Sequence, residues 1–197
     1  MAAPSRCLPI TKGALLSTRR VLVVVVMGVL ACLQAWMPAC AMAEPSSESR
    51  IKAGIVYNLA LVVSWPDSLP QGSLFGIGMI GHDDAEPFLA SLAAKTVRGR
   101  GLALREQPTG QALDEIRIAY ISRSQATVLP ALLATLASRP VLTVSEMDGF
   151  CEQGGMVQMR RERNRVQLRV NREAAEKAGL RLSSQLLKVA EIVGGGD

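Results

Sequence analysis

The sequence predicts an α/β fold: a single domain with a central mixed β-sheet flanked by helices, and a β-hairpin near its C-terminal part. Two observations support this prediction. Short apolar runs typical of strands alternate with helical patterns along residues 44–197. Two later segments alternate apolar and polar residues on either side of a short polar loop, which is the pattern of an antiparallel hairpin. The segment 44–197 is long enough to form one hydrophobic core.

The first 43 residues have the three parts of a cleavable signal peptide. Residues 1–20 contain four basic residues and no acidic residue, and an unbroken apolar run follows over 21–31. Small residues at positions 41 and 43 predict cleavage between Ala43 and Glu44. The sequence therefore predicts export from the cytoplasm. Two alternatives are a retained membrane anchor and a lipoprotein attached at Cys32, where the preceding residues loosely resemble a bacterial lipobox.

Removal of residues 1–43 changes the charge and the cysteine content. Four of the 22 basic residues and none of the 17 acidic residues lie there, so the net charge falls from +5 to about +1. This balance gives no support for nucleic-acid binding. Cys151 is then the one remaining cysteine, so no intramolecular disulfide is expected. Cys151 is either buried, free, or paired between two chains of a homodimer.

The first half of the domain is predicted to alternate helices and strands. A helix is expected over Ser49–Ser64, because Ile51, Ile55 and Leu59 recur on one face. Its opposite face is also apolar, which indicates burial in a core or cover by a partner. Trp65 precedes a proline and ends the helix. Further expected elements are a strand over Leu74–Ile80, a helix from Asp83 or Asp84 to Ala94, and strands over Gly101–Glu106 and Ile116–Ile121.

The second half is predicted to hold the hairpin and three helices, within an ordered core over 46–193. Pro130 predicts a kink or restart inside a helix over Ser124–Ser138. The hairpin pairs Val157–Arg160 with Val166–Val170 through the loop 161–164. The other expected elements are a strand over Val141–Val144, a helix over Asn171–Ala178, and a last helix from Ser183 or Ser184 with Leu186, Leu187, Ala190 and Val193 inward.

Gly76, Gly78 and Gly81 have the G-x-G-x-x-G spacing of dinucleotide-binding proteins. In those proteins the glycines lie in the loop between a strand and a helix, where backbone N–H groups meet a pyrophosphate. Here the glycines fall within the predicted strand. We interpret Gly76 and Gly78 as positions on one strand face that leave room for close packing of a helix.

The sequence predicts no catalytic residue, no metal site and no cofactor. His82 is the only histidine, and with Cys151 it cannot supply the four Cys or His ligands of a structural zinc site. Cys151 would act as a nucleophile only with a base such as His82 beside it. The protein is therefore predicted not to be an enzyme.

Three residues are candidates for a binding surface. Arg98 and Arg100 flank a glycine before a predicted strand. They form either a solvated loop or a clamp for an anion, because arginine offers bidentate hydrogen bonds to carboxylates. Trp65 is expected either in the core or at a partner surface, where tryptophan is enriched.

A series of short motifs runs in order along nearly all of residues 44–197. They are Lys52-Ala53, Tyr57-Asn58-Leu59-Ala60, Val63-x-Trp65-Pro66, Val97-Arg98-Gly99-Arg100, Ile118-Ala119-Tyr120-Ile121-Ser122, Leu142-Thr143-Val144-Ser145-Glu146 with Phe150, Gly154-Gly155-Met156-Val157, Asn164-Arg165-Val166, and Gly179-Leu180 with Ser183-Ser184-x-Leu186-Leu187. Together they resemble the YfiR-like family of periplasmic regulators.

The resemblance implies a periplasmic protein without catalytic activity that binds and inhibits an inner-membrane diguanylate cyclase. Binding to the periplasmic region of that cyclase would lower cyclic-di-GMP signalling and so affect biofilm formation. An OmpA-like outer-membrane lipoprotein is implied as the partner that relieves the inhibition. The motif positions and residue chemistry together predict the partner- or ligand-binding residues Trp65, Arg98, Arg100, Glu146 and Phe150.

Two positions depart from the family pattern, and one alternative function is open. Leu61 and Ser64 stand where the family often has Lys and Glu, which makes the first helix more apolar. The alternative is a periplasmic small-ligand binding protein that feeds a transporter or a sensor kinase. Such a protein would have a pocket with convergent polar groups around Arg98 and Arg100.

Overall fold

The computed structural model describes residues 47–67, 74–83, 85–163 and 165–194. All elements below belong to one compact unit that spans Pro45–Asp197. The predicted signal peptide, its cleavage site at Ala43 and the alternative lipid attachment at Cys32 lie outside the described residues. Within the described part of the chain, no helix is both long enough and apolar enough to cross a membrane.

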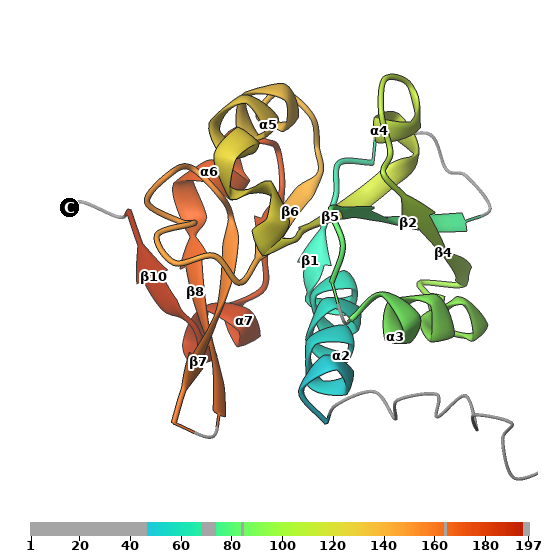
Figure 1. Cartoon of the computed structure of the whole chain (residues 1–197), viewed down its shortest axis with the longest axis horizontal. Coiled ribbons are helices and arrows are strands. Elements are labelled where there is room, and N and C mark those ends of the chain that lie inside the picture. Colours follow the sequence, from blue (N-terminus) through green and yellow to red (C-terminus); the bar gives the residue numbers. More distant parts are fainter. Residues whose placement is uncertain (1–46, 68–73, 84, 164, 195–197) are drawn as a thin grey trace, which may run out of the picture. The chain divides into compact units, whose positions relative to one another are not determined.

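An eight-stranded mixed sheet forms the centre of this unit, in the order β10-β8-β7-β6-β5-β2-β4-β3 (Figure 1). Neighbouring strands from β4 through β2, β5 and β6 to β7 are parallel, whereas β8 is antiparallel to β7. The strands are β2 (Leu74–Ile80), β3 (Thr96–Val97), β4 (Arg100–Glu106), β5 (Ile116–Ile121), β6 (Leu142–Ser145), β7 (Val157–Glu162), β8 (Arg165–Asn171) and β10 (Glu191–Val193). The predicted fold class is confirmed.

The longer strands were predictable, and the shortest ones were not. β2 and β5 have the predicted bounds, and the hairpin of β7 and β8 forms with a shorter loop than expected. Three features were not predicted: β3, β10, and a separate two-stranded ladder of β1 (Val63–Ser64) with β9 (Arg181–Leu182). Strands of two or three residues are too short to show an alternating pattern.

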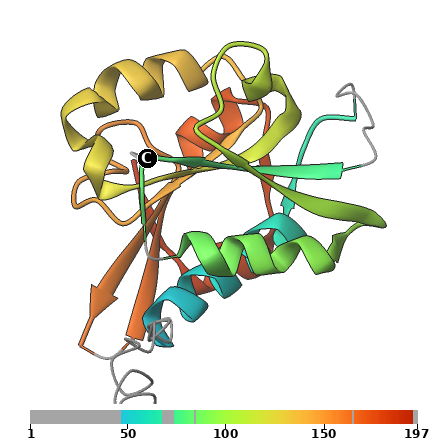
Figure 2. The same ribbon diagram turned by 45° about the vertical axis from the view of Figure 1, so that its right-hand side comes forward.

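Helices cover both faces of the sheet (Figure 2). Two buried clusters correspond to the two faces: one includes residues of α2 and α3, and the other includes residues of α5. The helical elements are α2 (Ser47–Val62), α3 (Glu86–Ser91), η1 (Leu92–Ala94), α4 (Ala112–Glu115), η2 (Arg123–Val128), α5 (Leu129–Leu136), α6 (Arg172–Lys177) and α7 (Ser184–Val189).

The predicted buried face of α2 is wrong in part. Ile51 is 51% exposed, whereas Ala53, Val56 and Ala60 face the core and are almost completely buried. The helix is apolar nearly all round, so hydrophobicity alone did not select a face. The face that packs inward includes small alanine side chains, which permit close approach to the sheet.

The helix ends follow the local signals in the sequence. Pro130 lies in the first turn of α5, directly after the 3₁₀ segment η2, so the predicted restart is confirmed. The Asn171 side chain accepts a hydrogen bond from the backbone N–H of Ala174 and caps α6, as predicted. The last helix is shorter than predicted, because residues 191–193 pair with β8 as β10.

Gly76 and Gly78 are sites of close packing, but their nearest neighbours are the end of the short helix α4 and the start of β5, not the face of a helix packed along the strand. A Cβ atom at Gly76 would lie 2.4 Å from the backbone oxygen of Glu115, and one at Gly78 would lie 2.8 Å from the side chain of Ile116. Both glycines belong to β2 and not to a loop before a helix. The glycine spacing therefore reflects the close approach of β5 and the segment before it.

Candidate functional site

Three of the five predicted binding residues, Trp65, Arg98 and Arg100, lie together in one groove. Its inner recess has a volume of about 60 Å³ and is lined by Trp65, Pro66, Asp67, Phe75, Val97, Arg98, Arg100 and Arg117. An outer hollow of about 480 Å³ shares Trp65, Pro66, Asp67 and Arg98 with it, and is also lined by Ser64, Gly179 and Arg181. We call the recess and the hollow together the Trp65 groove.

Trp65 is held in place at the centre of this groove. It directly follows β1, and its indole Nε1–H donates a hydrogen bond of 3.1 Å to the backbone oxygen of Arg117. Its ring also meets Phe75 edge to face, with centroids 5.1 Å apart and an angle of 85° between the ring planes. Trp65 is only partly buried. It therefore contacts the core and presents part of its surface in the groove.

Arg98 occupies a tight turn that directs it to the groove. Arg98 and Gly99 are the two residues between β3 and β4, and their φ angles are 51° and 78°. Positive φ at both central residues is typical of a type I′ hairpin, although arginine seldom adopts this conformation. The Nη2 group of Arg98 donates hydrogen bonds to the backbone oxygen of Val63 at 2.9 Å and to Ser64 Oγ at 3.2 Å. The turn is thereby attached to β1.

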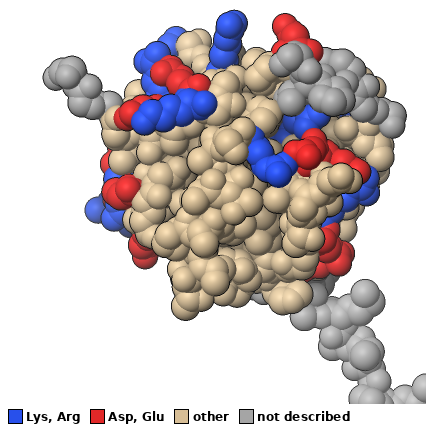
Figure 3. All heavy atoms as spheres, turned by 90° about the horizontal axis from the view of Figure 1, so that it is seen from above, with Lys and Arg blue, Asp and Glu red and all other residues tan. Residues whose placement is uncertain are grey.

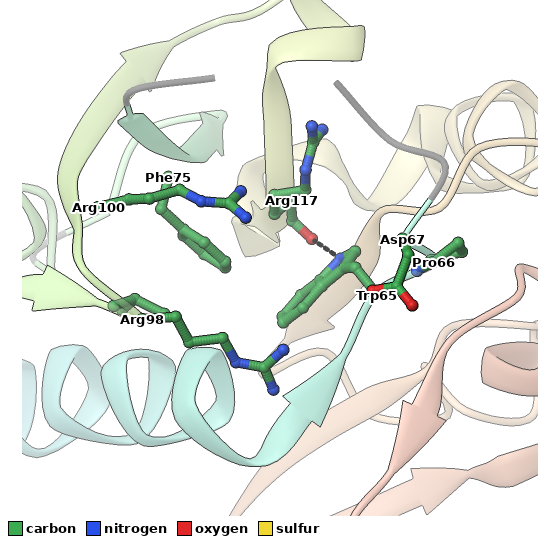
Figure 4. Close-up of a pocket in the computed structure, with 8 residues that line it drawn as sticks. Trp65, Pro66, Asp67, Phe75, Arg98, Arg100 and Arg117 are labelled. Carbon is green, nitrogen blue, oxygen red and sulfur yellow. Dashed lines mark hydrogen bonds between the residues drawn. The ribbon is translucent and has the colours of Figure 1, made fainter. Parts of the chain in front are cut away.

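Arg100 adds positive charge at the inner recess, whereas the Arg117 guanidinium points away from Trp65 and its Nη1 donates hydrogen bonds to the backbone oxygens of Asp114 and Ile116 (Figure 4). Figure 4 shows Arg98 and Arg100 reaching toward Trp65 from two sides, while the Arg117 backbone oxygen receives the tryptophan hydrogen bond. Burial lowers the pKa of Arg117, and the nearby charge of Arg100 lowers it further, against a smaller opposite effect of Asp114. Positive charge thus exceeds negative charge around the recess.

The charge excess is local. The described residues that line the Trp65 groove include one acidic residue, Asp67, and four arginines: Arg98, Arg100, Arg117 and Arg181. On the face shown in Figure 3, by contrast, basic and acidic side chains adjoin one another around a broad uncharged area. The groove is therefore a place where an anionic group would be attracted.

Glu146 lies at a second site, at the carboxyl ends of the parallel strands. Glu146 Oε1 accepts a hydrogen bond of 2.7 Å from the Tyr120 hydroxyl and lies 2.8 Å from Lys52 Nζ. Burial and then the charge of Glu146 raise the pKa of Tyr120, so its hydroxyl stays protonated and donates. Burial lowers the pKa of Lys52, but its contact with Glu146 and the charges of neighbouring carboxylates outweigh this and raise it overall.

A cavity of about 350 Å³ adjoins this ion pair, and we call it the carboxyl-end crevice. It is lined by Glu48, Lys52, Asp83, Arg123, Glu146, Met159, Arg161 and Val166. Arg161 pairs with Glu48, and Arg123 Nε lies 3.9 Å from Glu146 Oε2. Positive and negative groups are balanced here, unlike in the Trp65 groove.

Phe150 is a core residue, which corrects its prediction as a binding residue. It is completely buried in the second core cluster, beside Gly155. A Cβ atom at Gly155 would lie 2.2 Å from the Phe150 ring. The motif positions of these two residues therefore reflect their packing against each other.

Cys151 is also completely buried, which bears on its predicted roles. Its Sγ lies 3.4 Å from the backbone oxygen of Arg169, and burial raises the pKa of the thiol to about 11. A disulfide between two chains would require this part of the fold to open. The side chain of His82 is 89% exposed, so it does not form a nucleophile–base pair with the buried thiol.

Arg117, Arg181, Lys52 and Tyr120 were not predicted as site residues. One signal pointed to Arg117, since it is a charged residue inside an otherwise apolar strand, and it is buried in the fold. Lys52 and Tyr120 stand in the quoted motifs, but their contacts with Glu146 are distant in the sequence, and nothing local marked Arg181. Among the described residues, no group of three or more His, Cys, Asp or Glu side chains is arranged to hold a metal ion.

An α/β domain with an arginine-rich surface groove around a fixed tryptophan has the features of a binding protein. The chain belongs to the YfiR/HmsC-like family, whose model matches residues 49–191. This family is regulatory and non-catalytic, and it acts with a partner protein in cyclic-di-GMP pathways. The predicted family is thereby confirmed.

A similar solved structure is that of a conserved domain protein from Vibrio cholerae O1 biovar El Tor strain N16961. The two chains are 12% identical with a TM-score of 0.47, and the match covers 73% of this chain and 59% of that chain. A comparison with curated proteins gives no match.

Proposed function

We propose that this protein is a periplasmic regulator that binds the periplasmic region of an inner-membrane diguanylate cyclase and inhibits it, which lowers cyclic-di-GMP signalling. The observation that carries the proposal is the Trp65 groove. It combines a fixed tryptophan with several arginines, and these residue types supply much of the binding energy in protein interfaces. Family membership supports the pathway and the need for a partner. The periplasmic location rests on the predicted signal peptide.

The groove suits a docking role because its main side chains are already held in position. The hydrogen bond of Trp65 to Arg117 and the bonds of Arg98 to β1 fix two of them before a partner arrives. Side chains that are already ordered lose little conformational entropy on binding. More of the contact energy is then available as affinity.

Inhibition follows if the protein binds the inactive state of the cyclase more tightly than the active state. A binding partner shifts such an equilibrium only by its difference in affinity for the two states. A preference of about 100-fold corresponds to about 2.7 kcal/mol at 25 °C. An OmpA-like outer-membrane lipoprotein would relieve inhibition by binding the same regulator and withdrawing it from the cyclase.

The test is deletion of the gene and measurement of cellular cyclic-di-GMP. The level should rise, and the wild-type gene supplied on a plasmid should lower it again. A variant that lacks residues 1–43 should fail to lower it, because it would remain in the cytoplasm. If deletion raises cyclic-di-GMP under no growth condition, the inhibitor function is contradicted.

Small-ligand binding is a second candidate function, and the carboxyl-end crevice favours it. Its volume of about 350 Å³ is within the usual range for ligand sites, and both charge signs line it. Such a protein would feed a transporter or a sensor kinase. A thermal-shift screen with amino acids and nucleotides should reveal a ligand whose effect is lost in Glu146→Gln. If no compound shifts the melting temperature, this second function is contradicted.

A further inference from the structure

The Trp65 groove holds like charges close together, which points to an anionic ligand. Arg98, Arg100 and Arg117 line the inner recess, with Asp67 as the one acidic residue among its described lining residues. Burial lowers the pKa of Arg117, and the charge of Arg100 lowers it further, so positive charge is concentrated here. A carboxylate between Arg98 and Arg100 would gain charge-assisted hydrogen bonds.

The size of the recess restricts what can enter it. Its volume of about 60 Å³ is far below the roughly 300 Å³ at which small-molecule sites begin. A cavity needs roughly 10–15 Å³ on this measure to hold one water molecule, so the recess has room for a group of carboxylate size. The outer hollow of about 480 Å³ shares Trp65 and Arg98 with the recess and is also lined by Gly179 and Arg181. A small recess beside a wider hollow suits the tip of a side chain on a longer segment.

The walls of the groove match the parts of an acidic side chain. Trp65 and Phe75 form an apolar edge that would contact the methylene groups. Arg98 is attached to β1 through one guanidinium nitrogen, Nη2, and a guanidinium has three nitrogen atoms with five N–H donors. Arg100 approaches from the opposite side of the tryptophan (Figure 4).

We propose that the Trp65 groove binds an acidic segment of the partner protein, with one Asp or Glu carboxylate in the inner recess between Arg98 and Arg100. The rest of the segment lies along the outer hollow toward Arg181. This inference rests on the proposed function for the statement that the partner is a protein. The acidic character of the segment follows from the groove itself.

Trp65 provides a direct measure of binding. The chain has two tryptophans, Trp36 and Trp65, so the full chain with Trp36→Phe has Trp65 as its only tryptophan. Its fluorescence is followed during titration with a hexaglutamate peptide at fixed ionic strength. A hexalysine peptide serves as the probe of opposite charge. We expect a saturable change with hexaglutamate, none with hexalysine, and weaker binding as salt is added.

Arg98→Asn combined with Arg100→Gln removes both guanidinium groups and should weaken hexaglutamate binding at least tenfold. Asparagine tolerates the positive φ of position 98. The matched control is Arg163→Asn, since Arg163 is exposed, has a φ of 54°, and lies at the tip of the β7–β8 hairpin. This control should bind like the parent chain. Arg100→Gln alone, which leaves the Arg98 hydrogen bonds intact, replaces the double variant if circular dichroism shows that the latter is unfolded.

Three results would overturn the inference: no saturable change with hexaglutamate, equal affinity in the arginine variants, or equal affinity for free glutamate or sulfate at matched ionic strength. The third result would assign the groove to small anions. If hexaglutamate fails to bind while gene deletion still raises cyclic-di-GMP, the inference falls and the proposed function stands. If hexaglutamate binds through both arginines while deletion has no effect, the chemistry of the groove stands without the inhibitor function.

Discussion

The two ends of the parallel strands differ in how their charges are arranged. At the amino ends, Arg100 at the start of β4 and Arg117, the second residue of β5, line the Trp65 groove, where positive charge is in excess. At the carboxyl ends, Glu146 after β6 contacts Lys52 and Tyr120, and acidic and basic groups balance. Positive charge is thus in excess at one end, whereas at the other end the acidic and basic groups are equal in number.

Open α/β sheets usually bind ligands beyond the carboxyl ends of their strands, whereas the surface that we propose for the partner protein lies at the amino ends. Here the loops at the carboxyl ends are joined to one another. The Gln107 side chain bonds both the N–H and the backbone oxygen of Gly81, and Ser122 Oγ donates to the backbone oxygen of His82 at 2.6 Å. Changes at the carboxyl ends should therefore affect stability most, and changes at the amino ends should affect binding most.

The largest effect is expected at the carboxyl ends, from Glu146→Ala. It would remove the carboxylate closest to the Lys52 ammonium and the acceptor of the Tyr120 hydroxyl, and Lys52 would keep only the longer contacts with Glu48 at 3.7 Å and Asp83 at 4.0 Å. The free energy of unfolding, measured in urea, should fall by about 3 kcal/mol. Glu176→Ala, which removes an exposed pairing with Arg172, is the control and should cost less than about 0.5 kcal/mol. Equal losses of unfolding free energy in Glu146→Ala and Glu176→Ala would contradict the special importance of the carboxyl ends for stability.

Gly76→Ala should produce the next largest effect, in the strand that supplies Phe75 to the groove. The added Cβ would collide with the backbone oxygen of Glu115, which cannot move without displacing the start of β5. We expect a loss of about 2 kcal/mol in urea unfolding. Gly54→Ala in α2 is the counterpart, because no atom lies within 4 Å of its new Cβ, and it should gain about 0.5 kcal/mol. A neutral Gly76→Ala would show that the strand tolerates a side chain there.

Arg100→Gln should separate binding from stability at the amino ends. Arg100 is only partly buried, so the free energy of unfolding should change by less than about 0.5 kcal/mol. Affinity for the partner should fall about tenfold, which is about 1.4 kcal/mol. In a deletion strain, the variant should therefore lower cyclic-di-GMP less than the wild type does at equal protein level. Full activity of the variant would exclude Arg100 from the docking surface.

Ionisation of the Cys151 thiol should have the smallest effect on the free energy of unfolding, and this effect is confined to high pH. Burial raises the pKa of its thiol from 9.0 to about 11, so the folded state favours the neutral form. Its contribution to stability is thus constant below about pH 8 and is lost as the pH rises from about 9 to 11. Between pH 7 and pH 10 the wild type should lose about 1 kcal/mol more than Cys151→Ala in urea unfolding. Parallel losses in the two proteins would show that the thiol is not protected from ionisation.

Elements with strong local signals could be predicted from the sequence. The apolar runs at Leu74–Ile80 and Ile116–Ile121 are strands with the expected bounds, and Asn171 and Pro130 mark helix starts. These signals act over a few residues. The short strand β10 and the buried face of α2 have no such signal, because they are determined by pairing with β8 and by contact with the sheet.

The sequence by itself determined the fold class, the family and three residues of the candidate site, since Trp65, Arg98 and Arg100 stand in recognisable motifs. Only the tertiary structure decided that Arg117 and Arg181 join them, that Glu146 lies at the other end of the strands, and that Phe150 is in the core. The physical reason is that periodicity and capping depend on neighbouring residues, whereas strand order and register depend on burying the core on both faces of the sheet. Those long-range contacts place distant residues at a common end of the sheet.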